Sequence, residues 1–468
     1  MKYIFPNKII EAKKVKNADL LLKNKSLQIG LNEIELTTFI EGSYVVLDYA
    51  KEMCGGVRIL THVSDGAVIR IRFGESLSEC HVDVGCEQNA TNDHSLRDFT
   101  TQLVSYSDMT FANTGYRFIR IDMIKGSATI KNVLGTNRIL SKKTKWKYCG
   151  GDKKISEIFN TAKRTIDLCA NGEYLWDGIK RDRLVWVGDM HPEMLALTTL
   201  YGRLPIIEKS LDFIKKQTPL PKWMNNFPTY SMWWIIIVAD YSAATDAEDF
   251  TEKQIDYIKG LIDLMSDNVS KDGELRYPFL FVDWQTHEKP DEIQGSRAIN
   301  IIAVKKAIEV LKRFNENTDK AEDLLKRLLK KEITVDSSKS VLGLKYFAVG
   351  LTESDKKKLL ENGVSGFSTF MSYYILKAIA SFDKEKAVEM LKEYYGAMLN
   401  KGATSFWEDF DISWAENSCR IDEMPKKGEK DIHGDFGAHC YTGFRHSLCH
   451  GWSAGVIKFI KDEIYEKS

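Results

Sequence analysis

The segment KKTKWKYCGGDKK (142–154) marks the point at which the pattern of apolar residues changes. Before it, short runs of alternating apolar and polar residues dominate, bounded by Gly, Asn, Asp and Ser: YVVLDYA (44–50), GVRILTHV (56–63), AVIRIRFG (67–74) and YRFIRIDMI (116–124). A period of two residues places successive side chains on opposite faces of a strand. Several such strands at short spacing predict an antiparallel β-sandwich over residues 1–144.

After this segment the apolar residues recur at spacings of three and four, as in ISEIFNTAKRTIDLCA (155–170) and KEKAVEMLKEYYGAML (384–399). That spacing is typical of amphipathic helices. Many antiparallel helices with unusual residues on the loops between them predict an α/α toroid over residues 145–468, in which paired helices surround a central cleft. A helical solenoid is the alternative, but the sequence shows no self-similarity at a fixed period.

Length and charge limit the classes of partner. The 468 residues exceed one simple core, and 66 basic residues balance 66 acidic ones, so no overall field favours nucleic acid or an anionic membrane. The longest apolar run, MWWIIIVA (232–239), is too short to span a bilayer. The N-terminal residues lack the apolar segment and cleavage site of a secretory signal, which predicts a cytoplasmic protein with a neutral ligand. The oligomeric state stays open.

Cysteine and histidine spacing favours neither a metal nor a cofactor. The eight cysteines include no CxxC pair, as expected of reduced thiols. No glycine-containing segment has the spacing of a phosphate loop. One cluster near the C-terminal end has metal-ligating side chains but no HxxxH spacing on an evident helix; it comprises His433, His439, Cys440, His446, Cys449 and His450.

The segment DGIKRDRLVWVGD (177–189) concentrates ionisable groups beside a tryptophan. Asp177, Asp182 and Asp189 alternate with basic residues, and Trp186 lies among apolar neighbours. Aromatic faces cover the C–H side of a sugar ring, while carboxylates bind hydroxyls and perform the acid and base steps of glycoside cleavage. The segment therefore predicts a sugar site, although an aspartate among basic residues is also typical of a surface ion pair.

Four further segments pair aromatic residues with polar or acidic ones, and we expect all four on loops of the helical part. For any single tryptophan, burial in the core is the more frequent explanation. Their joint occurrence favours a common site. The segments are PTYSMWW (228–234), FVDWQTHEKPDE (281–292), GATSFWEDFD (402–411) and HSLCHGWSAG (446–455).

In this order the motifs resemble those of the α-L-rhamnosidases of glycoside hydrolase family 78, whose catalytic domain is an (α/α)6 barrel. The segments LDYAKEMCGGVRI (47–59), IRFGESLSE (71–79) and TGYRFIRID (114–122) resemble the β-sandwich segments that precede that barrel. The resemblance covers nearly the whole chain. It implies an N-terminal antiparallel β-sandwich followed by an (α/α)6 barrel and a carbohydrate substrate.

The resemblance also implies which residues act. The family motif reads roughly D-x-x-R-D-E-R-L-G-W-T-G-D, and an ungapped match places Asp182 on the glutamate that serves as general acid. Aspartate keeps the carboxylate but shortens its reach by one methylene. A match with a one-residue gap leaves no acid at that position; we prefer the ungapped match because it preserves the distance from Asp177 to Asp189. Glu408 occupies the position of the general base in a segment that resembles the family's GATT-x-WE.

The same comparison implies the residues that bind the sugar. Asp177 and Asp189 correspond to family residues that bind hydroxyls, and His450 resembles a histidine near the end of the barrel. Trp407 or Trp452 is expected to face the C6 methyl group of a deoxyhexose. The full set of expected substrate-binding residues is Asp177, Arg181, Trp186, Asp189, His191, Trp234, Trp284, Trp407, His450 and Trp452.

These roles predict an inverting exo-α-L-rhamnosidase that releases terminal L-rhamnose. The acid must hold its proton near neutral pH, so we expect Arg181 and Arg183 to point away from Asp182 and to pair with Asp177, Asp189 or other loop acids. Two alternatives stay open. One is a glycosidase of the same barrel class that acts on another sugar, and the other is a sugar-binding protein without catalysis.

Overall fold

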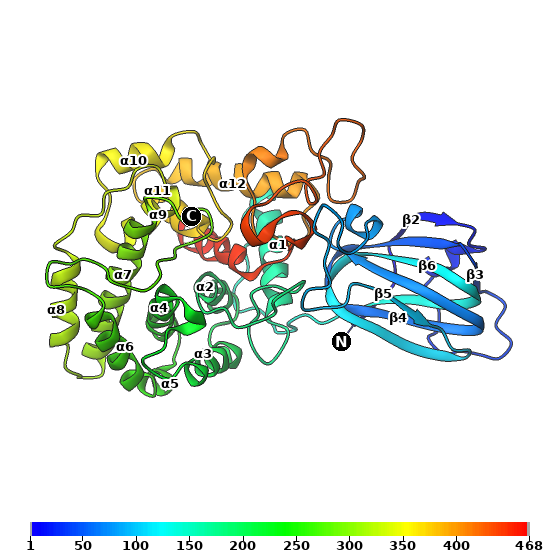
Figure 1. Ribbon diagram of the computed structural model, residues 1–468, viewed down its shortest axis with the longest axis horizontal. Helices are drawn as coiled ribbons and strands as arrows, with labels where there is room; N and C mark the ends of the chain where they lie inside the picture. Colours follow the sequence, from blue (N-terminus) through cyan, green and yellow to red (C-terminus); the bar gives the residue numbers. More distant parts are fainter. Residues whose placement is uncertain (1, 466–468) are drawn as a thin grey trace.

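Strands form the first part of the chain and helices the second, as Figure 1 shows. The computed structural model describes residues 2–465. The last strand ends at Asn137, before the segment at which the sequence pattern changes, and the first α-helix begins at Lys153, at the end of that segment. The strands are β1 (Lys2–Ile4), β2 (Lys8–Lys13), β3 (Thr37–Ile40), β4 (Tyr44–Gly74), β5 (Asp98–Gln102) and β6 (Ser107–Asn137).

The strands pair antiparallel throughout, as the alternation predicted. They form one six-stranded sheet in the order β1-β6-β4-β2, with β3 added on β6 and β5 on β4. β4 and β6 are long and curled, so residues 118–122 pair with both 44–48 and 70–74. All four alternating runs of the sequence fall inside these two strands. Their inward side chains form a hydrophobic cluster that includes Ile59, Ile71 and Ile119.

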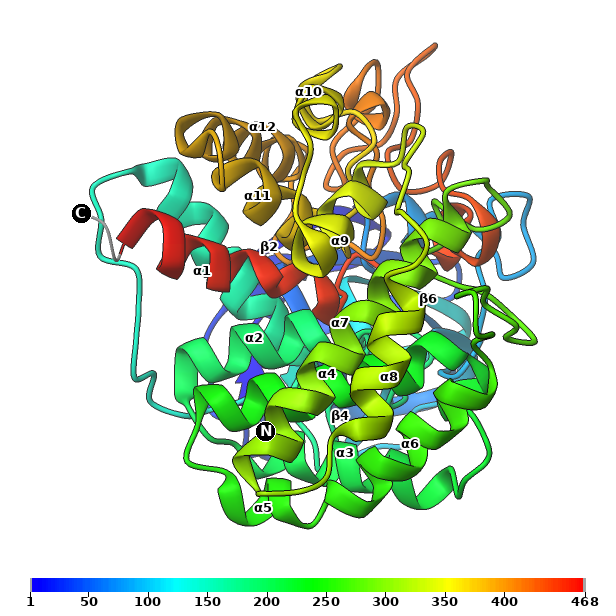
Figure 2. The same ribbon diagram turned by 90° about the vertical axis from the view of Figure 1, so that its left-hand side faces the viewer.

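The helical part contains thirteen α-helices within the described residues. Figure 2 shows them in an end-on view. They are α1 (Lys153–Cys169), α2 (Met190–Tyr201), α3 (Pro205–Gln217), α4 (Pro228–Ala244), α5 (Glu248–Glu252), α6 (Ile255–Asp267), α7 (Glu292–Arg313), α8 (Asp319–Leu328), α9 (Lys339–Val349), α10 (Glu353–Leu360), α11 (Ser372–Ala380), α12 (Lys384–Asn400) and α13 (Val456–Phe459).

Six of these helices contact one another in a closed cycle. α2 contacts α4, α4 contacts α7, α7 contacts α9, α9 contacts α11, α11 contacts α13, and α13 contacts α2. The remaining helices include α8, which packs on α7, and α12, which packs on α11. α2 and α4 are buried on nearly every face, whereas α8 buries only Ala321, Leu324 and Leu328. An inner helix is apolar all round, and an outer helix carries one apolar stripe.

The expectation that PTYSMWW (228–234) lies on a loop is wrong, because these residues begin α4. The residues after the first motif, including His191, likewise belong to a helix, α2. Both helices are buried on nearly every face, so their apolar residues show no helical period from which the sequence could reveal them. None of the helices among residues 2–465 is both long and apolar enough to cross a membrane.

A buried charge cluster joins the sheet to the helical part. Lys180, with no exposed surface, places Nζ 2.8 Å from a Glu79 carboxylate oxygen and 3.4 Å from one of Glu75. The same ammonium group donates to the carbonyl oxygen of Phe444 and, at 3.0 Å, to that of His446. Burial raises the pKa of Glu75 to about 7, although Lys180 opposes this shift.

The same junction contains three side chains that could bind a metal ion. Glu75, Glu79 and His433 are the one group of possible metal ligands among the described residues whose ligand atoms lie within 4.8 Å of one another. The Lys180 ammonium already supplies a cation to both carboxylates, so we do not assign a metal here.

Gly115 of β6 permits the close approach of residues 179–180 to the sheet. A Cβ at this position would lie 2.8 Å from the Ile179 side chain and 3.0 Å from the backbone nitrogen of Lys180.

Substitution of Lys180 tests the importance of this junction. Lys180→Ala would leave Glu75 buried without a cation and Glu79 with only Arg97, at 3.7 Å. We expect the free energy of unfolding to fall by about 3–5 kcal/mol. Urea denaturation measures the change. Lys209→Ala is the matched control, since Lys209 pairs with Glu173 on the surface and such pairs contribute about 0–1 kcal/mol. Equal losses in the two variants would contradict a structural role for the cluster.

Candidate active site

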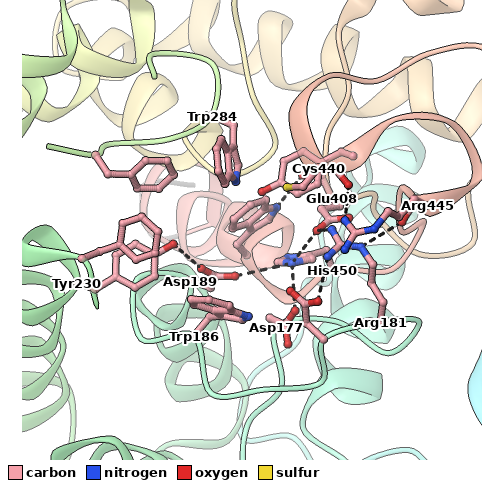
Figure 3. Close-up of a pocket in the computed structure, with 15 residues that line it drawn as sticks. Asp177, Arg181, Trp186, Asp189, Tyr230, Trp284, Glu408, Cys440, Arg445 and His450 are labelled. Carbon is pink, nitrogen blue, oxygen red and sulfur yellow. Dashed lines mark hydrogen bonds and ion pairs between the residues drawn. The ribbon is translucent and has the colours of Figure 1, made fainter. Parts of the chain in front are cut away.

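All five predicted motifs converge on one cavity of about 160 Å³, shown in Figure 3, and PTYSMWW contributes Tyr230 from the start of α4. The segment 177–189 leads into α2, residues 281–284 precede α7, Glu408 follows α12, and residues 440–452 precede α13. Its lining combines carboxylates and arginines with aromatic rings. The lining residues are Asp177, Arg181, Asp182, Trp186, Asp189, Phe227, Tyr230, Phe281, Trp284, Glu408, Cys440, Tyr441, Arg445, His450 and Trp452.

Asp182 lines the cavity and contacts His94 of the sheet part of the chain. Its backbone and that of Arg183 are left-handed, with φ of 53° and 58°. Non-glycine residues rarely adopt this conformation, and surrounding contacts must maintain it. One carboxylate oxygen of Asp182 lies 3.1 Å from a guanidinium nitrogen of Arg181 and 3.0 Å from Nδ1 of His94.

The arginines have only part of the partners expected from the sequence. Arg181 pairs with the loop acid Glu408 at 2.5 Å, as expected, but it also contacts Asp182. Arg183 donates to the carbonyl oxygen of Asn113 at 2.7 Å and lies over the Trp176 ring. The expectation that Arg181 points away from Asp182 is therefore wrong. The physical reason is that one guanidinium group bridges two carboxylates that approach it from different segments.

Glu408 is fixed through both its carboxylate and its backbone. One carboxylate oxygen accepts from Arg181, and the other accepts from the backbone N–H of Ser447 at 3.0 Å. Its carbonyl oxygen accepts from the Trp452 indole at 2.9 Å and from the Thr369 hydroxyl at 2.6 Å. Burial raises the pKa of Glu408, while Arg181 and the Ser447 amide favour the ionised form. This is the environment of an oriented carboxylate that can accept a proton.

His450 lies at the centre of the carboxylates. Its Nε2 is 3.6 Å from Glu408, 3.7 Å from Asp189 and 3.8 Å from Asp177, too far for a direct hydrogen bond. Burial, followed by the charge of Arg181, holds the pKa of His450 well below its ordinary value. The imidazole is therefore neutral at neutral pH, and these close approaches are not ion pairs. Nδ1 of His450 has no hydrogen-bond partner within the described structure.

Asp177 and Asp189 bind protons more tightly than ordinary aspartates. Burial raises the pKa of each well above the usual range, and the charge of neighbouring carboxylates adds to the effect. Asp177 still accepts from the backbone N–H of Leu184 at 2.9 Å. Desolvation and like charge together favour neutral carboxyl groups, which can donate as well as accept hydrogen bonds.

Aromatic rings form much of the remaining cavity wall. Trp452 stacks on Phe370, with ring centroids 4.9 Å apart and an interplanar angle of 17°. Trp186 meets Tyr230 edge to face at 6.2 Å. Tyr230 and Tyr441 contribute to the wall but were not among the expected residues. Tyr230 belongs to PTYSMWW, in which Trp234 is the expected residue, and Tyr441 lies in a segment without a distinctive pattern.

Three of the expected substrate-binding residues lie outside this cavity. His191 contacts the Tyr374 hydroxyl at 2.6 Å and Asp240 at 3.0 Å. The Trp234 indole donates to the carbonyl oxygen of Leu211 at 3.2 Å. The Trp407 ring is buried against Phe410. Each side chain projects into the helical core, because a helix or a buried turn directs neighbouring residues to different sides.

The sequence of this chain matches no known family model and no curated protein. Solved structures, in contrast, share its fold. A rhamnosidase from Klebsiella oxytoca with rhamnose bound is 18% identical, with a TM-score of 0.75 over 98% of this chain and 95% of that one. A family 78 rhamnosidase of Bacillus sp. GL1 is 16% identical, with a TM-score of 0.70 over 92% of this chain and 48% of its own.

An α-L-rhamnosidase from Streptomyces avermitilis, solved in complex with L-rhamnose, is 12% identical, with a TM-score of 0.66 over 98% of this chain and 43% of its own. This chain shares the fold of family 78 rhamnosidases. The resemblance that its motifs carry is thereby confirmed at the level of structure. The chain spans nearly all of the Klebsiella oxytoca protein but about half of the other two.

The raised pKa of Asp189 predicts a dependence of stability on pH. The protonated carboxyl group suits the folded state, so its stabilising contribution is present at low pH and is lost as pH rises toward the folded-state pKa. Asp189→Asn should therefore increase the free energy of unfolding at pH 8, by on the order of 1 kcal/mol or more, and change it little at pH 4. Urea denaturation at both pH values measures this. The exposed Asp246→Asn is the control, and an equal effect of Asp189→Asn at both pH values would refute the assignment.

Proposed function

We propose that this chain is an inverting exo-α-L-rhamnosidase, with Asp182 as general acid and Glu408 as general base. The observation that carries the proposal is the common cavity of these two carboxylates, one from each end of the helical part, on either side of the Arg181 guanidinium. The fold supports it, because two of the similar structures were solved with rhamnose. Fold alone does not determine activity, so the proposal depends on the residues of the site.

The proposal includes the architecture expected from the resemblance. We interpret the curled antiparallel sheet as a β-sandwich domain over residues 1–144 and the helices as an (α/α)6 barrel over residues 145–468. The closed cycle of contacts among α2, α4, α7, α9, α11 and α13 supports the barrel. The hydrophobic cluster of the sheet, separate from that of the helices, supports two domains.

Hydrolysis with inversion requires two carboxyl groups on opposite faces of the sugar, roughly 6.5–9.5 Å apart, so that water fits between sugar and base. Arg181 keeps Asp182 and Glu408 from direct contact. Protonated Asp182 donates to the glycosidic oxygen as its bond to the anomeric carbon breaks. Ionised Glu408 takes a proton from the water that attacks the opposite face. A cavity of about 160 Å³ suits one monosaccharide, which favours release of a terminal sugar.

The other lining residues supply recognition. Asp177, Asp189 and His450 present hydrogen-bonding groups to the sugar hydroxyls, and Arg181 binds near the reacting atoms. Trp186, Trp284 and Trp452 offer apolar faces for the C–H side of the ring and for the methyl group of a deoxyhexose. His191, Trp234 and Trp407 are not part of this proposal, since they lie in the helical core.

A sugar-binding protein without catalysis is the second candidate. The contact of Asp182 with Arg181 favours it, because a nearby cation opposes protonation of the acid. Hydrolysis of p-nitrophenyl α-L-rhamnoside, beside a panel of other p-nitrophenyl sugars, separates rhamnosidase from a glycosidase for another sugar. Calorimetric binding of L-rhamnose without turnover would select the binding protein. Proton NMR of the first sugar released should show the β anomer, and an α product would overturn inversion.

Glu408→Gln tests the base directly. The amide keeps an acceptor for the Ser447 N–H but cannot take a proton from water, so kcat should fall by about 10²- to 10⁴-fold. Affinity for L-rhamnose, measured by calorimetry, should change little. Glu332→Gln, at an exposed position, is the matched control and should retain activity. Wild-type kcat in Glu408→Gln would rule out the proposed role.

A further inference from the structure

A segment of the sheet domain contacts Asp182, the candidate acid, and Arg445, both of which line the cavity. It lies between the short helix Ser78–His81 and β5. Asn89 donates to Thr442, Asp93 forms an ion pair with Arg445 at 2.9 Å, and His94 contacts Asp182. The motifs identified in the sequence do not include this segment.

His94 meets both the backbone and the side chain of Asp182 through one ring nitrogen. Nδ1 lies 2.6 Å from the Asp182 backbone nitrogen and 3.0 Å from its carboxyl oxygen Oδ1. Because the backbone N–H can only donate, Nδ1 is the acceptor in the first contact and bears a lone pair. That lone pair also faces Oδ1. Two acceptors at this distance repel each other unless a proton lies between them, so the contact favours a protonated carboxyl group.

We propose that His94 of the N-terminal domain is a positioning residue that shares a proton with Asp182 and keeps this acid ready to donate. The proposal rests on the proposed function, since it concerns the acid of that reaction. It explains how Asp182 can hold a proton although Arg181 lies 3.1 Å from the same oxygen.

The charged groups nearest the contact between His94 and Asp182 are themselves paired with opposite charges. Arg181 faces Asp182 but also binds Glu408, which offsets part of its positive charge. On the His94 side, the neighbouring Asp93 pairs with Arg445. His94 is 42% exposed, whereas the Asp182 side chain is 18% exposed. The imidazole thus connects a largely enclosed carboxyl group with solvent.

His94 also supports the unusual backbone of the motif. Asp182 and Arg183 are both left-handed, and each such residue costs about 1–3 kcal/mol unless its surroundings maintain it. The sheet domain contacts both residues, through His94 at the Asp182 N–H and through the Asn113 carbonyl at the Arg183 side chain. These two contacts fix the direction of the acid.

In the reaction the Asp182 proton passes to the glycosidic oxygen, and the electron pair of the broken bond stays on that oxygen. Water adds to the anomeric carbon and gives one proton to Glu408. Asp182 then regains a proton from solvent, and Glu408 releases its proton to solvent. The enzyme returns to its starting state with no further reactant.

Leaving-group dependence tests the proposal. p-Nitrophenol leaves with little help from an acid, whereas methanol must be protonated as it departs. We expect His94→Ala to lower kcat/KM for methyl α-L-rhamnoside about tenfold more than for p-nitrophenyl α-L-rhamnoside. A role confined to structure or sugar binding would lower both equally, because both substrates carry the same sugar.

His94→Asn is the conservative variant. The asparagine carbonyl oxygen can accept from the Asp182 N–H but does not share a proton near neutral pH. We expect it to restore activity on the p-nitrophenyl substrate relative to His94→Ala, and to leave methyl rhamnoside hydrolysis impaired. Equal losses on both substrates, or full recovery of both in His94→Asn, would overturn the role of His94 alone. Absence of turnover by the wild-type protein on either substrate would instead overturn the proposed function.

Discussion

The buried ammonium group of Lys180 determines how the two parts of the chain meet. It binds Glu75 and Glu79 from the sheet domain and two carbonyl oxygens of the segment 444–446. Lys180 directly precedes Arg181 and Asp182, so this contact also fixes the start of the proposed acid motif. On the other side, the Glu75 carboxylate accepts from the Leu448 N–H at 2.6 Å and the Ser447 hydroxyl at 3.2 Å. Ser447 in turn donates to Glu408. Both proposed catalytic carboxylates therefore depend on one charge cluster.

The cavity holds more carboxyl groups than cations. Arg181 serves Asp182 and Glu408, Arg445 is paired with Asp93, and His450 is neutral. Burial and mutual repulsion then keep protons on part of this acidic set. Such an arrangement destabilises the folded chain at neutral pH, and proteins retain it where function requires perturbed carboxyl groups. The aromatic walls strengthen the effect, because they exclude water from the same space.

The local pattern of apolar and polar residues predicted much of the secondary structure and several residues of the site. The alternating runs became β4 and β6, and amphipathic helices such as α12 followed their three-and-four spacing. α4 was not predicted, because the apolar residues of a helix buried on nearly every face show no helical period. At the site, Asp177, Asp189 and Glu408 could be placed because they lie in compact motifs. Tyr441 could not, since it lies in a segment without a distinctive pattern. His94 could not, since only the packing of the sheet on the helical part brings it into contact with Asp182.

The same packing bears on the departure of this chain from the family motif. Aspartate at position 182 is one methylene shorter than the glutamate of the motif that this segment resembles, so the proposed acid depends on its surroundings for its reach. The left-handed backbone at Asp182 and Arg183 alters the direction of the side chain, and contacts from His94 and Asn113 maintain that backbone. The sheet domain therefore does more than cover one face of the helices. It supplies groups that contact Asp182 and Arg183, so we expect substitutions in that part of the chain to affect the proposed acid without contacting the proposed sugar.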